Sequence, residues 1–174
     1  MRRDLFTHLL SAVVLFAVAA AGAFAQDSPS RPINPIKWSL KADLPAKPLQ
    51  AGGKFTVQLT AEIEDGWHLY STEEIPLGPR PTRITLAPSQ PFELNDIEAP
   101  LPRRELDRNF GIETEFYEHS VTFTLPVQIK AEAASGTHKL TVQVRYQCCT
   151  ETLCLPPRLV KLEVEVPIKE RAIR

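Results

Sequence analysis

The chain has 174 residues, with 20 basic and 21 acidic side chains and a formal net charge of −1. A near-neutral chain without a basic patch does not fit a nucleic-acid-binding protein, and its length fits a single domain with a sizeable core. All three cysteines of the chain fall within positions 148–154, which directs attention to thiol or metal chemistry at one place.

The first 25 residues are expected to be a secretory signal peptide. A short basic start precedes an apolar run over 9–24, and an Ala-Phe-Ala motif at 23–25 places small residues where a signal peptidase reads them. The apolar run is short for a membrane-spanning helix, and a polar segment follows it at once. We therefore expect cleavage after Ala25 and a flexible leader over 26–35; the alternative is retention of the segment as an anchor.

Residues 36–168 are expected to form one all-β domain, followed by a charged tail over 169–174. Apolar and polar residues alternate with the period of strands, and prolines and glycines mark the turns between them. About seven to eight short antiparallel strands without a helix favour an immunoglobulin-like β-sandwich. The expected strands cover 36–41, 55–63, 67–70, 82–87, 92–97, 115–129, 138–148 and 159–167.

The segment 98–114 shows neither strand nor helix periodicity. It contains two prolines and then a run of charged residues. We expect a long irregular loop that exposes one aromatic residue, Phe110, followed by Gly111. Long ordered loops in compact domains are often functional.

The cysteine cluster is expected to close a hairpin between the strand that ends at Cys148 and the strand that begins near residue 158. Cys148 is in phase with Tyr146 and should point into the core, where it acts as a small hydrophobic residue. A tight return can bring Cys149 and Cys154 within disulfide distance, whereas adjacent cysteines rarely pair. The odd, clustered cysteine count in an exported chain favours a reactive pair over a stabilising crosslink, which gains little in so short a loop.

Two other hypotheses stay open for this cluster. One is a non-enzymatic β-sandwich binding module with a structural disulfide. The other is a copper or zinc carrier that uses the three cysteines and His68, although a second paired ligand motif is missing. We expect neither a metal nor a cofactor.

The motif Tyr-Gln-Cys-Cys at 146–149, followed by Cys-Leu-Pro-Pro at 154–157, resembles the redox signature of the amino-terminal domain of the bacterial thiol:disulfide interchange protein DsbD. The segment 65–70 resembles a further strand of that family. Residues 110–117 and 125–127 resemble its cap loop and the strand that follows.

The resemblance implies an immunoglobulin-like fold and a periplasmic relay of electrons by thiol–disulfide exchange. Carried over by position, Cys149 and Cys154 are the redox pair, and Phe110 is the aromatic cap that covers it. The remaining residues that line the site are His68, Tyr70 and Tyr146.

The resemblance also implies thioredoxin-like periplasmic partners, among them disulfide isomerases and proteins of cytochrome c maturation. Electrons would arrive through a membrane electron conveyor on a separate protein, so that the domain meets the membrane only through its partners. The chain departs from the family twice. Its cysteines are one residue closer together than in the best-known members, and Arg108 and Asn109 stand where some members carry acidic residues.

Overall fold

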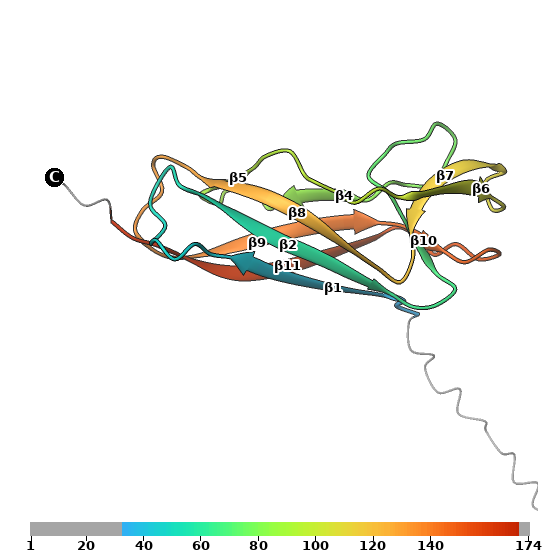
Figure 1. Cartoon of the computed structure of the whole chain (residues 1–174), viewed down its shortest axis with the longest axis horizontal. Coiled ribbons are helices and arrows are strands. Elements are labelled where there is room, and N and C mark those ends of the chain that lie inside the picture. The colour runs from blue at the N-terminus through green and yellow to red at the C-terminus, as the bar shows by residue number, and fades with distance from the viewer. Residues whose placement is uncertain (1–32, 171–174) are drawn as a thin grey trace, which may run out of the picture. The chain divides into compact units, whose positions relative to one another are not determined.

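Antiparallel strands make up the computed structural model of residues 33–170, and no helix interrupts them (Figure 1). The expected signal peptide, most of the leader and the end of the tail lie outside these described residues. No helix in the described part is long and apolar enough to cross a lipid bilayer. The strands are β1 (Ile36–Asp43), β2 (Lys54–Ile63), β3 (His68–Tyr70), β4 (Arg83–Leu86), β5 (Phe92–Leu94), β6 (Arg103–Asp107), β7 (Ile112–Tyr117), β8 (Ser120–Ile129), β9 (Gly136–Tyr146), β10 (Cys148–Cys149) and β11 (Arg158–Ile168).

The strands form three antiparallel sheets. Their orders are β1-β2-β8-β5, β11-β9-β4 and β10-β3-β7-β6. The first two sheets enclose the main core. The third, which we call the small sheet because its four strands are short, places β6, β7 and β10 at one end of the sandwich (Figure 1). The predicted all-β, immunoglobulin-like sandwich is confirmed.

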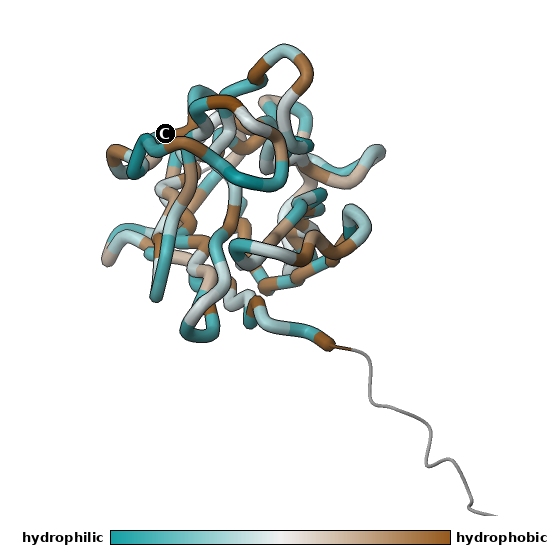
Figure 2. Tube along the Cα trace, turned by 90° about the vertical axis from the view of Figure 1, so that its right-hand side faces the viewer, coloured by the Kyte–Doolittle hydropathy of each residue, from teal (hydrophilic) through white to brown (hydrophobic). Residues whose placement is uncertain are grey.

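The main core follows from the period-2 pattern of the long strands. In β2, Phe55, Val57 and Leu59 are buried, while the residues between them are partly exposed. The same alternation of buried and exposed residues runs along β8 and β9, and Figure 2 shows hydrophobic and hydrophilic residues interspersed along the chain. Because successive strand side chains point to opposite faces, each long strand contributes one apolar row to the space between the sheets.

The structure differs from the expectation at 98–114, which is not an irregular loop. Residues 103–107 form β6, which pairs with β7 in a hairpin that turns at 108–111. Four of the five residues of β6 are exposed, because the strand lies at the free edge of the small sheet. An edge strand exposed on both faces carries no apolar row, and so its sequence shows no period. We call β6, β7 and their turn the cap hairpin.

The structure has more strands than the seven to eight expected. The additional strands are β6 and the two-residue β10, together with one that arises because the expected strand over 115–129 is divided into β7 and β8. The short strands expected at 67–70 and 92–97 are present as β3 and β5. A strand of two residues, such as β10, is too short to display alternation.

Candidate functional site: a disulfide beneath the cap hairpin

A disulfide joins Cys149 to Cys154, whose Cα atoms lie 4.1 Å apart. Cys149 belongs to β10 and pairs with His68 of β3, so the small sheet holds one end of the bridge in place. Residues 149–154, which we call the cysteine loop, turn tightly because Thr150 N donates a hydrogen bond to Leu153 O over 2.8 Å. Cys149 is fully buried, whereas Cys154 is partly exposed, so the sulfur of Cys154 is the more accessible of the two.

Cys148 faces the opposite way from Cys149. It packs in the main core with Tyr146, while Cys149 packs in a separate small cluster at the end of the sandwich. Burial raises the pKa of the Cys148 thiol to about 11. A buried thiol with a raised pKa is a poor nucleophile, because the thiolate is the reactive form. The expectation that Cys148 is a packed thiol is confirmed.

Alkylation of the oxidised protein tests this difference between the cysteines. We expect no label on the native protein, because its one free thiol is Cys148, and one label after denaturation. Denaturation with a reductant should give labels at all three cysteines. Rapid labelling of native oxidised protein at Cys148, measured by peptide mass spectrometry, would contradict the assignment.

The disulfide lies against an aromatic cluster. Tyr70, Phe116 and Cys149 form its buried part, and Phe110 and Cys154 pack against them. Phe110 is half-buried rather than exposed as expected, because the turn of the cap hairpin folds its ring onto the cluster. The rings of Phe110 and Tyr70 meet edge to face, with their centroids 6.1 Å apart.

The turn that carries Phe110 depends on the residue after it. Gly111 has a φ of +69°, in the left-handed region, and its N–H donates to Asp107 O over 2.7 Å. A side chain at this position would strain the backbone. The glycine therefore fixes the turn from which the Phe110 ring projects.

Asp107 is a buried carboxylate at the centre of the site. It accepts a hydrogen bond from Tyr70 Oη over 2.6 Å and one from the backbone N–H of Asn109 over 2.8 Å. Thr114 Oγ1 donates a third over 3.3 Å. The hydroxyl of Tyr70 also lies 3.1 Å from His68 Nε2. Asp107 thus links Tyr70 of β3 to the turn of the cap hairpin.

The environment shifts the pKa values of this network. Burial alone would raise the pKa of Asp107, but hydrogen bonds from Tyr70 and Asn109 and the nearby His68 outweigh it and hold that pKa below its usual value. Burial lowers the pKa of His68, although Asp107 opposes the shift. Burial and the hydrogen bond to Asp107 raise the pKa of Tyr70. At neutral pH the site therefore holds an ionised Asp107, a neutral His68 and a protonated Tyr70.

The lowered pKa of His68 predicts a pH dependence of stability. Below about pH 6.5, the ordinary pKa of histidine, the unfolded chain takes up a proton at His68 that the folded protein resists. Folding stability should therefore fall between about pH 7.5 and about pH 5.5. The His68→Gln variant should lose less stability over this interval in urea titrations. Equal losses would contradict the assignment, since the other histidines are the same in both proteins.

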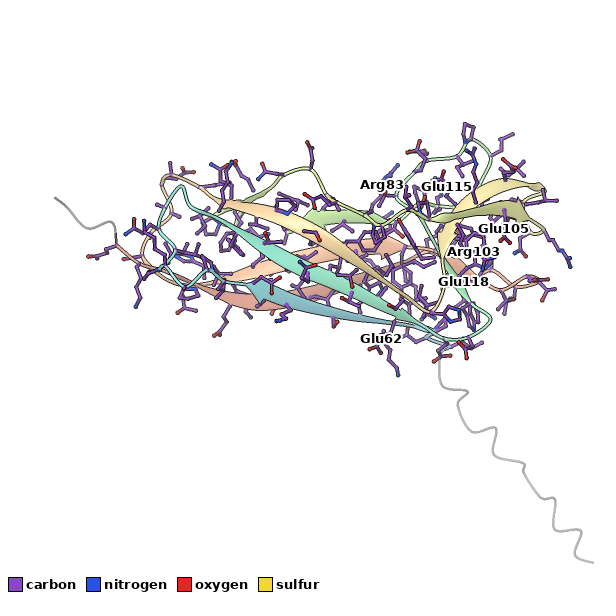
Figure 3. All side chains as sticks on the ribbon, viewed as in Figure 1. Glu62, Arg83, Arg103, Glu105, Glu115 and Glu118 are labelled. Carbon is purple, nitrogen blue, oxygen red and sulfur yellow. A yellow bond between two sulfur atoms is a disulfide. The ribbon has the colours of Figure 1, made fainter. Side chains whose placement is uncertain are left out.

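The solvent-facing side of the cluster is closed by charged residues of the cap hairpin. The guanidinium of Arg103 lies 5.9 Å from the centroid of the Phe116 ring and pairs with Glu105 and Glu118 (Figure 3). A pocket of about 250 Å³ opens nearby, and its lining includes His68 and Glu151. The disulfide is thus covered by a hairpin that has ion pairs of its own.

The structure brings most of the expected site residues together, and it adds others. His68, Tyr70 and Phe110 join the disulfide cluster, whereas Tyr146 lies in the main core beside Trp38. Sequence reasoning missed three residues of the site: Asp107, Asn109 and Phe116. The available signal was weak, because Asp107 stands three residues before Phe110 among several charged residues and nothing nearby indicates its burial.

No group of three or more His, Cys, Asp or Glu residues within 33–170 is arranged to hold a metal ion. Cys148 and Cys149 belong to different clusters, so their sulfurs do not converge on one point.

An immunoglobulin-like sandwich with a disulfide in a short loop, covered by an aromatic hairpin, defines a class of disulfide-bearing β domains. Comparison with known protein families identifies the family within this class. The family described as "Thiol:disulfide interchange protein DsbD, N-terminal" matches residues 40–165, and the chain belongs to this family.

One curated relative is the thiol:disulfide interchange protein DsbD of Actinobacillus pleuropneumoniae serotype 5b (strain L20). It is 28% identical over 160 residues, which are 92% of this chain and 23% of the relative. The chain therefore spans less than a quarter of the length of the curated relative that it matches.

Two of the solved structures that are similar to the chain come from Proteus mirabilis and Neisseria meningitidis. The N-terminal periplasmic domain of ScsB from Proteus mirabilis has a TM-score of 0.51 at 17% identity, over 81% of this chain and 49% of that one. This likeness supports the fold. The reduced DsbD N-terminal domain of Neisseria meningitidis has a TM-score of 0.47 at 20% identity, over 67% of this chain and 82% of that one.

Proposed function

We propose that this domain carries out thiol:disulfide interchange in the periplasm through Cys149 and Cys154. The observation that carries the proposal is the disulfide itself, which lies in a surface loop beneath a hairpin instead of inside the core. Membership of the DsbD N-terminal family supports the type of reaction. The expected signal peptide and the periplasmic domain named in the ScsB relative support the compartment.

The difference in burial between the two cysteines suggests the order of bond changes. A thiolate of the electron donor attacks Sγ of the more accessible Cys154, forms a mixed disulfide and releases Cys149 as the leaving sulfur. A second donor thiolate then attacks the donor sulfur of that mixed disulfide and releases Cys154. Two electrons and two protons enter the domain, which ends with two thiols, while the donor ends with a disulfide.

The reverse sequence passes the electrons on. The Cys154 thiolate attacks a disulfide of the acceptor, and Cys149 resolves the resulting mixed disulfide by re-forming the bond to Cys154. Thioredoxin-like periplasmic proteins are the proposed acceptors, and a membrane electron conveyor is the proposed source. This makes the domain an electron relay of the protein-disulfide reductase type.

Phe110, Tyr70 and His68 have proposed roles around the sulfurs. Phe110 shields the disulfide until a partner displaces the cap hairpin, and Tyr70 and His68 form the polar wall of the site. Burial disfavours a lasting negative charge on the Cys149 sulfur, and the ionised Asp107, which accepts a hydrogen bond from Tyr70 of the same cluster, adds to this. Proton uptake should therefore accompany the release of Cys149.

Trapping of the mixed disulfide tests the proposal. In a Cys149→Ser variant, the Cys154 thiolate should attack a thioredoxin-like protein whose active-site cysteine carries a small thiol leaving group. The resulting disulfide between the two proteins should be stable, because the resolving thiol of Cys149 is missing. Non-reducing electrophoresis and mass spectrometry would identify the bond. Cys148→Ser serves as the control and should exchange like the parent protein.

A purely structural disulfide would give a different result. The parent protein would then stay oxidised in the presence of a reduced thioredoxin-like protein, and the Cys149→Ser variant would form no adduct. Reduction of the bond would lower folding stability without changing the redox state of any partner. That outcome would favour a non-enzymatic binding module.

A further inference from the structure

Two contacts join the turn of the cap hairpin to the cysteine loop. The side-chain amide of Asn109 donates a hydrogen bond through Nδ2 to Thr150 O over 2.8 Å. Beside it, Arg108 Nη1 lies 3.2 Å from Glu151 Oε2. Both acceptors belong to the segment that the Cys149–Cys154 bond closes. The hairpin therefore reaches the loop that carries the disulfide through directed polar contacts, in addition to the packing of Phe110.

The backbone of Asn109 is held in place by Asp107. Its backbone N–H donates to Asp107 Oδ1, and the other oxygen of that carboxylate accepts from Tyr70 Oη. A continuous path of hydrogen bonds thus runs from β3 through Asp107 and Asn109 to Thr150. Because the backbone of Asn109 is held, its side chain loses little freedom when it binds the carbonyl.

The two contacts differ in strength. The Asn109 bond is also exposed, but it is a directed hydrogen bond of 2.8 Å to a backbone carbonyl and does not depend on the attraction of two charges. The side chains of Arg108 and Glu151 are both 76% exposed, so water and salt screen their attraction. Asn109 should therefore hold the hairpin more firmly than Arg108 does.

We propose that Asn109 and Arg108 are positioning residues that latch the cap hairpin onto the cysteine loop and set how often the Cys149–Cys154 disulfide is uncovered. This inference rests on the cap that belongs to the proposed function, and it adds what holds that cap closed. Thr150 directly follows Cys149, so a reagent that approaches the sulfurs meets the latch at the edge of its path. The disulfide then reacts only in the fraction of molecules in which the hairpin has left the loop.

Reduction of the oxidised protein by dithiothreitol tests the latch. Each reagent molecule gives up two thiol hydrogens and closes its own disulfide, which leaves thiols at Cys149 and Cys154. Rapid alkylation and mass spectrometry then report the rate. Asn109→Ala should be reduced about fivefold faster than the parent protein, as the loss of one hydrogen bond implies. Arg108→Ala should be reduced about twofold faster. Salt should accelerate reduction of the parent protein by screening the Arg108–Glu151 pair, and it should not accelerate reduction of Arg108→Ala.

A matched control lies on the same hairpin. Arg104 forms an ion pair with Glu113, with 3.5 Å between Nε and Oε2, and both side chains are exposed to a similar degree. This pair bridges β6 and β7 without reaching the cysteine loop. Arg104→Ala should therefore be reduced at the parent rate. If Arg104→Ala were reduced as fast as Arg108→Ala, the latch proposal would be wrong, because any loss of an ion pair in the hairpin would then speed reduction of the disulfide.

Reversal of the charges gives a second measurement. Arg108→Glu and Glu151→Arg should each be reduced faster, whereas the double variant should return towards the parent rate, because the attraction is restored. Parent-like reduction of Asn109→Ala would also overturn the proposal. No protein partner takes part in this assay, so it tests the latch separately from the proposed function. The latch proposal can be wrong although mixed disulfides with a partner form, and it can be right although no mixed disulfide forms.

Discussion

Replacement of Asp107 with alanine is expected to lower the free energy of unfolding by about 2–3 kcal/mol, because it removes the carboxylate acceptor of a buried tyrosine hydroxyl and two further hydrogen bonds. The side chain of Asp107 accepts hydrogen bonds from Tyr70, Asn109 and Thr114, and Tyr70 is only 1% exposed. The same loss frees the turn of the cap hairpin from β3. The disulfide of the variant should therefore be reduced by dithiothreitol more than tenfold faster. Urea unfolding and alkylation kinetics measure the two effects.

The pH dependence of this effect has a definite sign. The folded-state pKa of Asp107 lies below its usual value, so its stabilisation is present above about pH 4 and is lost as the pH falls through the folded-state pKa. The stability difference between the parent and Asp107→Ala should thus shrink in acid. Glu105→Ala is the matched control, since Glu105 is an exposed carboxylate of the same strand, and its effect should stay within about 0.5 kcal/mol. A larger effect of Glu105→Ala than of Asp107→Ala would contradict the assignment.

Phe123→Ala should lower the free energy of unfolding by about 3–5 kcal/mol. Phe123 lies in β8 and is fully buried. Its ring is stacked with Trp38, 6.4 Å between centroids, and meets Tyr117 edge to face at 5.7 Å. Truncation removes these contacts and leaves a cavity in a core held by two sheets. The melting temperature should fall by roughly 10–20 °C, as calorimetry would show.

Two comparisons make this prediction specific to the core. Thr122→Ala, at the exposed neighbouring position of β8, should change stability by no more than about 0.5 kcal/mol. At temperatures where Phe123→Ala remains folded, its disulfide should be reduced at the parent rate, because the ring belongs to the main core and not to the disulfide cluster. A large acceleration would show that the core and the cap are not independent.

The long strands could be predicted from the sequence because each has one buried face. β9 illustrates this, since Leu140, Val142, Val144 and Tyr146 are all buried, and the same phase continues to Cys148. That phase indicates which way Cys148 points, and the short spacing after it indicates the pairing of the other two cysteines. Alternate residues of each long strand face the core between the two main sheets, and this regular burial produces a regular apolar pattern in the sequence.

The cap hairpin could not be predicted in the same way. Asp107 is buried by Tyr70, which is 37 residues away, and Asn109 reaches Thr150 across 41 residues. Neither contact has a local pattern, because each joins the turn of an edge hairpin to another strand or loop. Arg108 and Asn109 could be recognised in the sequence as departures from the family, but not as contacts of the cysteine loop. The resemblance indicated where a cap lies, and only the structure shows what it touches.

The opposite orientation of Cys148 and Cys149 has a consequence for mutation at the level of the gene. Cys148 packs in the main core and its neighbour Cys149 packs in the disulfide cluster. The environment of each sulfur therefore depends on whether its position is odd or even along the strand. A substitution leaves that parity unchanged. Deletion of a single codon at Gln147 would reverse it, turning Cys148 towards the disulfide cluster and Cys149 towards the main core, although every cysteine would still be present.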